Sequence, residues 1–324
     1  MRAAVHERYG PPEVVRVLDR PVPSPGEGEL LVRVHRTTVN RTDTAYRSGR
    51  PAVNRVVAGV RRPRATVLGC EFAGVVTATG PGVREPAVGE RVFGYVEGRF
   101  GAHAEYLLVP ADGFLATIPP GVPDDVAAAA TEGAHYALAV LQRARIRSGE
   151  QVLVHGATGA IGSALVQLLH DAGATVTAVC DGEHADLVRG LGAVRVVDRT
   201  RSDSTRDPGT YDVVVDAVGK SSFGACRRLL RPRGRFVSTD LGRGAQNPLL
   251  ALVTPVLRRR RVVFPVPVAD PAMPGRLRDL LASGRFRPVL DPHRFRLEDV
   301  VEAHRYVETG QKIGSVVVEV APAG

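Results

Sequence analysis

Hydrophobic and polar positions alternate in short runs over the first 120 residues of the chain. LLVRVHRTTV at 30–39 and GVVTATG at 74–80 are rich in β-branched residues, and proline and glycine separate such runs. RVFGYV at 91–96 and AEYLLVP at 104–110 repeat the pattern. The pattern predicts a β-rich domain.

Near residue 123 the pattern changes to helical periods that alternate with short apolar runs. Residues 123–144 begin with a proline and two aspartates and continue with alanines, which predicts a helix. The apolar run 151–155, the helical period over 160–173 and the apolar run 174–180 predict one β-α-β unit. Four further runs complete a doubly wound parallel sheet: AVRVVD at 193–198, YDVVVDAVG at 211–219, GRFVSTDLG at 234–242 and RVVFPVPV at 261–268.

The C-terminal region predicts two helices, over 274–286 and 296–310, and a closing strand over 312–320. This is too little for a third core, so we expect these elements to complete the first domain. The predicted organisation is an α/β chain with a β-rich domain over 1–122 and 265–324 around a doubly wound parallel-sheet domain over 123–264. A ligand cleft is expected between the two.

Length and composition predict a soluble protein of two domains. The chain has 324 residues, more than the roughly 250–300 at which a single core usually stops growing. No apolar stretch approaches the about 20 residues that a membrane helix needs, so we expect no membrane partner. The N-terminus MRAAVHERYG does not resemble a signal peptide, and the three cysteines are scattered, which favours a cytoplasmic location.

The net charge of +9 raises the question of nucleic-acid binding. Arginines are spread along the chain, and the clusters at 61–64 and 258–261 contain none of the aromatic residues that stack on bases. We expect a solvated, arginine-rich surface and no nucleic-acid partner, with phosphate-bearing substrates as a lesser alternative.

The run HGATGAIG at 155–162 lies between a predicted strand and a predicted helix. Gly156 suits a tight turn, Gly159 a close phosphate and Gly162 close helix–strand packing, and the helix N-terminus attracts the anion. The alternative is a simple turn. The expected cofactor contacts, from this run and from the ends of later strands, are Gly156, Ala157, Thr158, Gly159, Ala160, Ile161, Gly162, Asp181, Val218, Gly219 and Leu241.

The end of the second strand of this sheet bears on the choice of dinucleotide. Asp181 and Glu183 lie there, and no basic residue follows before Arg189. An acid at this position binds the ribose hydroxyls and repels a 2′-phosphate, so local charge favours NADH. The alternative is that both acids belong to a solvated turn.

Motifs along almost the whole chain occur together in a specific order. They are YGPPEVVRV at 9–17, NRTDTAYRSG at 40–49, VLGCEFAGVV at 67–76, GERVFGY at 89–95, the glycine run and LGAVRVVD at 191–198. In these motifs the chain resembles the medium-chain dehydrogenase/reductase superfamily, and within it the zinc-free quinone oxidoreductase branch. The resemblance implies a GroES-like catalytic domain, a Rossmann domain, a nicotinamide cofactor that is usually NADPH, and commonly a homodimer.

The resemblance also implies that catalytic zinc is absent. Zinc-dependent members place a cysteine, a histidine and a second cysteine at positions that correspond to Asn40, Cys70 and Thr131, and only Glu71 matches the outer part of that pattern. VEGRFGAH at 96–103 stands in place of the four-cysteine structural lobe. We expect Cys70 to be a buried thiol.

Without a Lewis acid, the expected acceptors are quinones, enones or enoyl thioesters, which spread the charge of an added hydride. The candidate catalytic residues are Tyr46, Asn40 and His135, where relatives of this branch usually carry threonine at the last position. Tyr46 could instead pack a pocket and His135 could be a structural helix residue. NADH and NADPH both stay open, and a cofactor-binding protein without catalysis and a zinc alcohol dehydrogenase are the competing hypotheses.

Overall fold

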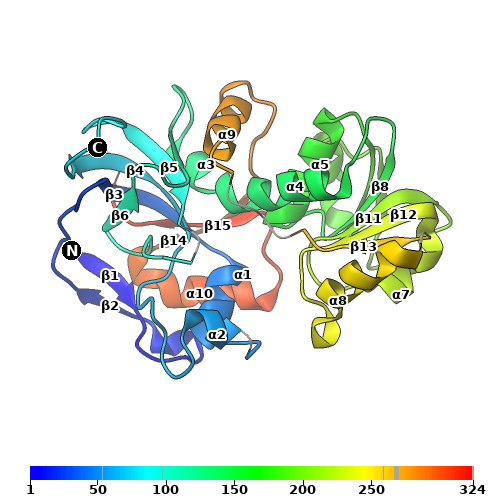
Figure 1. Cartoon of the computed structure of the whole chain (residues 1–324), viewed down its shortest axis with the longest axis horizontal. Coiled ribbons are helices and arrows are strands. Elements are labelled where there is room, and N and C mark those ends of the chain that lie inside the picture. Colours follow the sequence, from blue (N-terminus) through cyan, green and yellow to red (C-terminus); the bar gives the residue numbers. More distant parts are fainter. Residues whose placement is uncertain (53, 97, 258, 266–269, 323–324) are drawn as a thin grey trace. The chain divides into compact units, whose positions relative to one another are not determined.

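The computed structural model describes residues 1–52, 54–96, 98–257, 259–265 and 270–322 (Figure 1). Contacts divide the chain into two compact units. The β-rich unit comprises Met1–Glu132 and Asp270–Gly324, and the parallel-sheet unit comprises Gly133–Ala269. Residues 124–128 form a helix that packs on strands of the β-rich unit, which is why that unit extends past residue 122. The predicted domain limits of 123 and 264 stay a prediction.

A seven-stranded sheet forms the centre of the β-rich unit. The strand path is β14-β15-β3-β4-β5-β7, and β6 pairs with β3. The strands are β3 (Glu29–Val39), β4 (Glu71–Thr79), β5 (Arg91–Tyr95), β6 (Tyr106–Pro110), β7 (Leu115–Thr117), β14 (Leu290–Arg296) and β15 (Ser315–Glu319). β15 pairs antiparallel with β3, so the C-terminal region does return to the first part of the chain, as the sequence predicts.

Other elements surround this sheet. β1 (Arg2–Val5) and β2 (Arg16–Asp19) form a separate antiparallel pair. The helices are α1 (Arg41–Ser48), α2 (Asn54–Ala58), α3 (Asp124–Ala128), α9 (Met273–Ala282) and α10 (Val300–Thr309). The sheet and α10 share one core, because Val32 and Val34 of β3 cluster with Val300 and Val307 of the helix.

The parallel-sheet unit confirms the doubly wound sheet. Its strand order is β10-β9-β8-β11-β12-β13, and every pairing is parallel. The strands are β8 (Gln151–His155), β9 (Thr175–Cys180), β10 (Arg195–Asp198), β11 (Tyr211–Asp216), β12 (Leu230–Ser238) and β13 (Arg261–Val263). The predicted strand at 261–268 is shorter here, and its residues 266–268 lie outside the described residues.

Helices cover both faces of this sheet. They are α4 (Thr131–Ala144), α5 (Ala160–Asp171), α6 (Ala185–Gly190), α7 (Phe223–Cys226) and α8 (Gln246–Val253). In Figure 1, α4 and α5 lie on one side of the sheet, and α7 and α8 lie on the other. The strand order reverses between β8 and β11, and ligands of such sheets bind at the carboxyl ends of the strands at this point.

The prediction of a single helix over 123–144 is wrong. α3 ends at Ala128, and α4 begins at Thr131. The carboxylate of Glu71 accepts hydrogen bonds from the Thr131 hydroxyl (2.8 Å) and from the Glu132 backbone N–H (2.7 Å). A buried side chain from β4 therefore caps the start of a second helix, α4.

No helix of the described residues is long and apolar enough to cross a membrane.

Candidate functional site

The glycine run joins β8 to α5 and has the geometry of a phosphate loop. Gly156 has a φ of +75°, and a β-carbon there would lie 2.4 Å from Val218 Cγ1. A β-carbon on Gly162 would lie 2.0 Å from the Gly156 carbonyl oxygen. Gly159 precedes α5, and among the described residues only the Gly156 oxygen, at 3.5 Å, lies near its β-carbon position. The loop therefore combines a turn with positive φ at Gly156, a close backbone contact at Gly162 and open space at Gly159. This space lies at the N-terminus of the twelve-residue helix α5, where backbone N–H groups have no partner within the helix.

The remaining predicted cofactor residues follow the ends of neighbouring strands. Asp181 follows β9, Val218 and Gly219 follow β11, and Leu241 lies three residues beyond β12. Because these strands are parallel, their carboxyl ends lie along one edge of the sheet, beside the glycine run. The arrangement fits an extended dinucleotide at that edge.

Asp181 is not the unpaired acid that the sequence suggested. Arg199, the first residue after β10, makes a bidentate ion pair with it, with Nε 2.5 Å from Oδ1 and Nη2 2.7 Å from Oδ2. A search along the chain from Asp181 finds no basic residue before Arg189, but the adjacent strand brings Arg199 to the same place. Arg199 therefore neutralises Asp181, one of the two acids on which the NADH expectation rested.

In the β-rich unit, Asn40 is the N-cap of α1. Its Oδ1 accepts a hydrogen bond from the Asp43 backbone N–H (2.9 Å), and Asp43 Oδ2 accepts one from the Asn40 N–H (3.1 Å). Only 5% of Asn40 is exposed, and its Nδ2 has no hydrogen-bond partner among the described residues. An unpaired buried amide is costly, so this N–H group is available for a ligand.

The residues at the positions of zinc ligands take part in hydrogen bonds of their own. Cys70 is fully buried, as expected, and its Sγ lies 3.8 Å from Asp43 Oδ1. The Thr131 hydroxyl is bonded to Glu71. An amide, a thiol and a hydroxyl fit zinc poorly, and among the described residues no group of three or more His, Cys, Asp or Glu side chains has metal-binding geometry.

A pair of buried carboxyl groups lies behind these positions. Glu71 also accepts a hydrogen bond from the Thr38 hydroxyl (2.5 Å), which makes three donors in all with Thr131 and the Glu132 N–H. The side chain of Glu132 accepts from the Thr42 hydroxyl (2.6 Å). Burial, followed by the charge of Glu71, raises the pKa of Glu132 to about 8. Burial also raises the pKa of Glu71, so the two carboxyls together favour one shared proton at neutral pH.

Nothing in the sequence alone marks Glu132 as a site residue. An acid in the first turn of a helix normally complements the helix dipole from solvent, and only the fold shows that this one is buried beside Glu71.

Tyr46 and His135 lie in different units. Tyr46, on α1, stacks at an angle on Phe100 with ring centroids 4.5 Å apart, beside the buried Cys70. His135, on α4, is buried, and its ring centroid lies 6.2 Å from that of Tyr136. The structure brings Asn40 and Tyr46 onto one helix, and the meeting of both with His135 stays a prediction.

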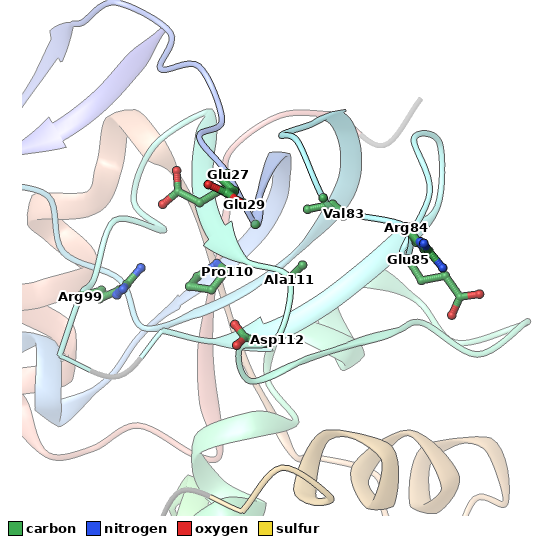
Figure 2. Close-up of a pocket in the computed structure, with 11 residues that line it drawn as sticks. Glu27, Glu29, Val83, Arg84, Glu85, Arg99, Pro110, Ala111 and Asp112 are labelled. Atoms are coloured by element: carbon green, nitrogen blue, oxygen red, sulfur yellow. The ribbon is translucent and has the colours of Figure 1, made fainter.

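A surface hollow of about 670 Å³ in the β-rich unit contains none of the predicted site residues. Figure 2 shows Glu27 and Glu29 together, Arg84 and Glu85 at one end, and Arg99 at the other. Its charges are mixed, and the hollow gives no sign of a substrate site.

Comparison with known proteins agrees with this geometry. Residues 26–120 match the alcohol dehydrogenase GroES-like domain, and residues 191–318 match the zinc-binding dehydrogenase family. The NADPH-dependent alkenal/one oxidoreductase of Arabidopsis thaliana is 30% identical over 99% of this chain and 80% of its own.

Two further proteins extend the comparison. The mycocerosic acid synthase-like polyketide synthase of Mycobacterium tuberculosis is 32% identical over 93% of this chain, which spans only 14% of that protein. The quinone oxidoreductase of Coxiella burnetii, at 23% identity, has the same fold, with a TM-score of 0.87 over 99% of both chains. The phosphate loop, the GroES-like and Rossmann architecture and these relatives together show that the chain belongs to the medium-chain dehydrogenase/reductase superfamily.

Proposed function

We propose that this protein is a zinc-independent, NAD(P)H-dependent reductase of quinones or α,β-unsaturated carbonyl compounds. The observation that carries the proposal is the Asn40 amide, a buried N–H donor without a partner at a position where zinc-dependent members hold a metal ligand. A neutral donor of this kind can bind a carbonyl oxygen but replaces only part of the charge stabilisation that a metal ion supplies. It therefore suits acceptors that delocalise the added charge themselves.

In this mechanism the chain binds and orients both reactants. A bound reduced nicotinamide supplies the hydride. The N–H groups at the start of α5 and the open position at Gly159 would hold the pyrophosphate of the cofactor. Asn40 Nδ2 would donate to the acceptor oxygen, which gains charge as hydride adds to the β-carbon or quinone ring. A proton then completes the reduction.

Turnover with a panel of acceptors tests this proposal. Metal-depleted protein should oxidise NAD(P)H with quinones, enones or enoyl thioesters, and added zinc should not raise the rate. Asn40→Ser keeps an N-cap acceptor for α1 but removes the amide, so kcat/KM should fall about 10- to 100-fold while cofactor affinity is unchanged. A cofactor-binding protein that consumes none, or one active only with zinc, would contradict the proposal.

His135 and Tyr46 require separate tests. If His135 relays a proton, His135→Thr should lower kcat and alter its pH dependence, whereas a structural histidine would leave both unchanged. If the Tyr46 hydroxyl acts directly, Tyr46→Phe should lower kcat with KM unchanged, whereas pocket packing would mainly raise KM.

We propose further that NADPH is the preferred cofactor and that Arg199 recognises its 2′-phosphate. A guanidinium that already makes a bidentate pair with the Asp181 carboxylate can make the same pair with a phosphate. The Arabidopsis relative is NADPH-dependent by name, which supports the same choice.

Binding measurements with both cofactors test this assignment. Arg199→Ala should weaken NADPH binding about 10- to 100-fold and change NADH binding less than about 3-fold. Asp181→Asn, which frees Arg199, should tighten NADPH binding. Arg201→Ala is the matched control in the same loop, and tighter binding of NADH by the wild type would contradict the assignment.

A homodimer in the cytoplasm completes the proposal. α8 and the turn after it expose four apolar side chains, Leu249, Leu252, Val253 and Val256, the second and fourth at 77% and 79% exposure. They lie beside β13, the last strand in the sheet order. An apolar patch next to an open strand edge fits a second copy of the chain.

A further inference from the structure

The proposed reaction needs a proton after the hydride, and the buried carboxyl pair of the β-rich unit offers one. Glu132 is 5% exposed, and its Oε1 lies 2.6 Å from the Thr42 hydroxyl. Burial raises the pKa of Glu71 as well, but its hydrogen bonds with the Thr38 and Thr131 hydroxyls and the Glu132 N–H oppose that rise. We therefore place the proton of the pair on Glu132, whose carboxyl is hydrogen-bonded to the Thr42 hydroxyl.

The position of Thr42 connects this carboxyl to the candidate substrate-binding residues. Thr42 is in the first turn of α1, two residues after Asn40 and one helical turn before Tyr46, so its side chain and that of Tyr46 share a helix face. Thr42 is only half-buried, whereas Glu132 is buried. The hydroxyl is thus the outer member of the hydrogen-bonded pair.

The surrounding charges set how readily Glu132 releases its proton. Glu71 and Asp43 both oppose ionisation of Glu132, and Lys312, whose Nζ donates to the Gly314 oxygen at 2.5 Å, favours it. Arg41 in turn opposes the positive charge of Lys312. The half-buried Lys312 amine among these acids leaves Glu132 with a pKa of about 8, not far above neutral pH.

We propose that Glu132 stores the proton that completes the reduction and that the Thr42 hydroxyl delivers it. This inference rests on the proposed function. The Thr42 hydroxyl, which donates to Glu132 in the structure, turns toward the acceptor for this step. After hydride adds to the β-carbon of the acceptor, the Thr42 O–H bond breaks as a C–H bond forms at the α-carbon, or an O–H bond at a quinone oxygen. Glu132 returns a proton to Thr42, becomes a carboxylate, and regains a proton from water.

Three variants test the relay. Glu132→Gln preserves shape but cannot release a proton, and Thr42→Val removes the hydroxyl while Thr42→Ser restores it. Thr44→Val is the matched control, because the Thr44 hydroxyl bonds only the Arg41 carbonyl oxygen of its own helix (3.0 Å). Steady-state rates from pH 6 to 10, in H₂O and D₂O, are measured beside the dissociation constant for NADPH.

The wild-type kcat should fall above pH about 8, where Glu132 loses its proton. Glu132→Gln and Thr42→Val should lower kcat at pH 7 about 100-fold, abolish this decline and change the solvent isotope effect, with NADPH affinity within about 2-fold of wild type. Thr42→Ser should recover most of the rate, and Thr44→Val should match the wild type.

Wild-type kcat and pH dependence in both Glu132→Gln and Thr42→Val would overturn the relay and leave the proposed function intact. If Glu132→Gln does not fold, the comparison of Thr42→Val with Thr42→Ser decides, and equal rates in these two would overturn it. A wild type that reduces no acceptor would overturn the proposed function and the relay together.

Discussion

The space available for an added β-carbon distinguishes the roles of the glycines in the phosphate loop. At Gly162 a β-carbon would overlap the Gly156 carbonyl oxygen, whereas at Gly159 the nearest atom is at ordinary contact distance. Gly162 is therefore required by the fold, and Gly159 is not. The space left at Gly159 is what a phosphate needs.

These two glycines should respond differently to the same substitution. Gly162→Ala should lower the free energy of unfolding by about 1–3 kcal/mol, because helix and loop must move apart. Gly159→Ala, with a φ of −72°, should fold with near wild-type stability but weaken NADPH binding at least about 10-fold. Chemical denaturation and cofactor titration measure both, and equal stability losses would contradict this distinction.

The sequence predicts the roles of these glycines because each depends on local chain geometry. It does not reveal Arg199 as a partner of Asp181, since the contact joins two neighbouring strands. It does not identify Glu132 as a buried acid either, because that depends on Glu71 of a distant strand. At the scale of the residue, local requirements are predictable and long-range contacts are not.

At the scale of the elements, α1 and α10 each contribute to a group of buried basic side chains, which also includes His6 and His103. His6 Nδ1 lies 3.0 Å from the Thr66 carbonyl oxygen and His103 Nε2 lies 2.8 Å from that of Thr38, so both of these nitrogens carry a hydrogen. The other ring nitrogens, His6 Nε2 and His103 Nδ1, then carry lone pairs and have no hydrogen-bond partner among the described residues.

His304 and Arg47 complete this group. His304 is fully buried with its ring centroid 5.9 Å from that of His103, and Arg47 is buried and ion-paired with Glu308. Burial, reinforced by the neighbouring positive charges, holds the pKa of His304 well below its usual value, and burial also lowers that of His6. Both histidines are therefore neutral in the folded protein at neutral pH.

Acid should destabilise the β-rich unit through these histidines. The unfolded chain binds protons on them near pH 6.5, whereas the folded chain does not, so the free energy of unfolding should fall as pH drops below about 6.5. Each histidine contributes up to about 1.4 kcal/mol per pH unit. Glu132 acts in the opposite direction, because its raised pKa favours folding at lower pH.

Denaturation of His304→Gln between pH 7 and 5 isolates this effect. The free energy of unfolding of the variant should depend less steeply on pH than that of the wild type, by close to the contribution of one proton, about 1.4 kcal/mol per pH unit. This holds whatever the stability of the variant at pH 7. His170→Gln, at an exposed position on α5, is the control and should keep the wild-type slope. Identical slopes in wild type and His304→Gln would contradict the prediction.

The predicted strands of the parallel-sheet unit and β3 to β6 are all present, because each is a continuous apolar or alternating run. α1 is short and polar, and its start depends on a capping box between Asn40 and Asp43 that the periodicity does not show. β14 reads LDPHRFR, with mostly exposed side chains, and pairs through its backbone with β15. Elements held by backbone pairing or caps are the ones that hydrophobic patterning misses.

At the scale of the whole molecule, the apolar face of α8 makes a prediction about assembly. Leu252→Asp with Val256→Asp should convert a dimer into a monomer, because a charge cannot be buried in an apolar interface. Light scattering after size exclusion gives the mass. Val194→Asp, at another exposed apolar position of the same unit, is the control, and a wild-type monomer would contradict the dimer.

The central claim is hydride transfer to a conjugated acceptor without zinc, and isotope tracing tests it most directly. NADPH carrying deuterium at the transferred C4 position is incubated with an enone and metal-depleted protein, and the product is analysed by NMR. Deuterium is expected at the β-carbon and a solvent proton at the α-carbon. An unlabelled β-carbon, or transfer that appears only after zinc is restored, would contradict it.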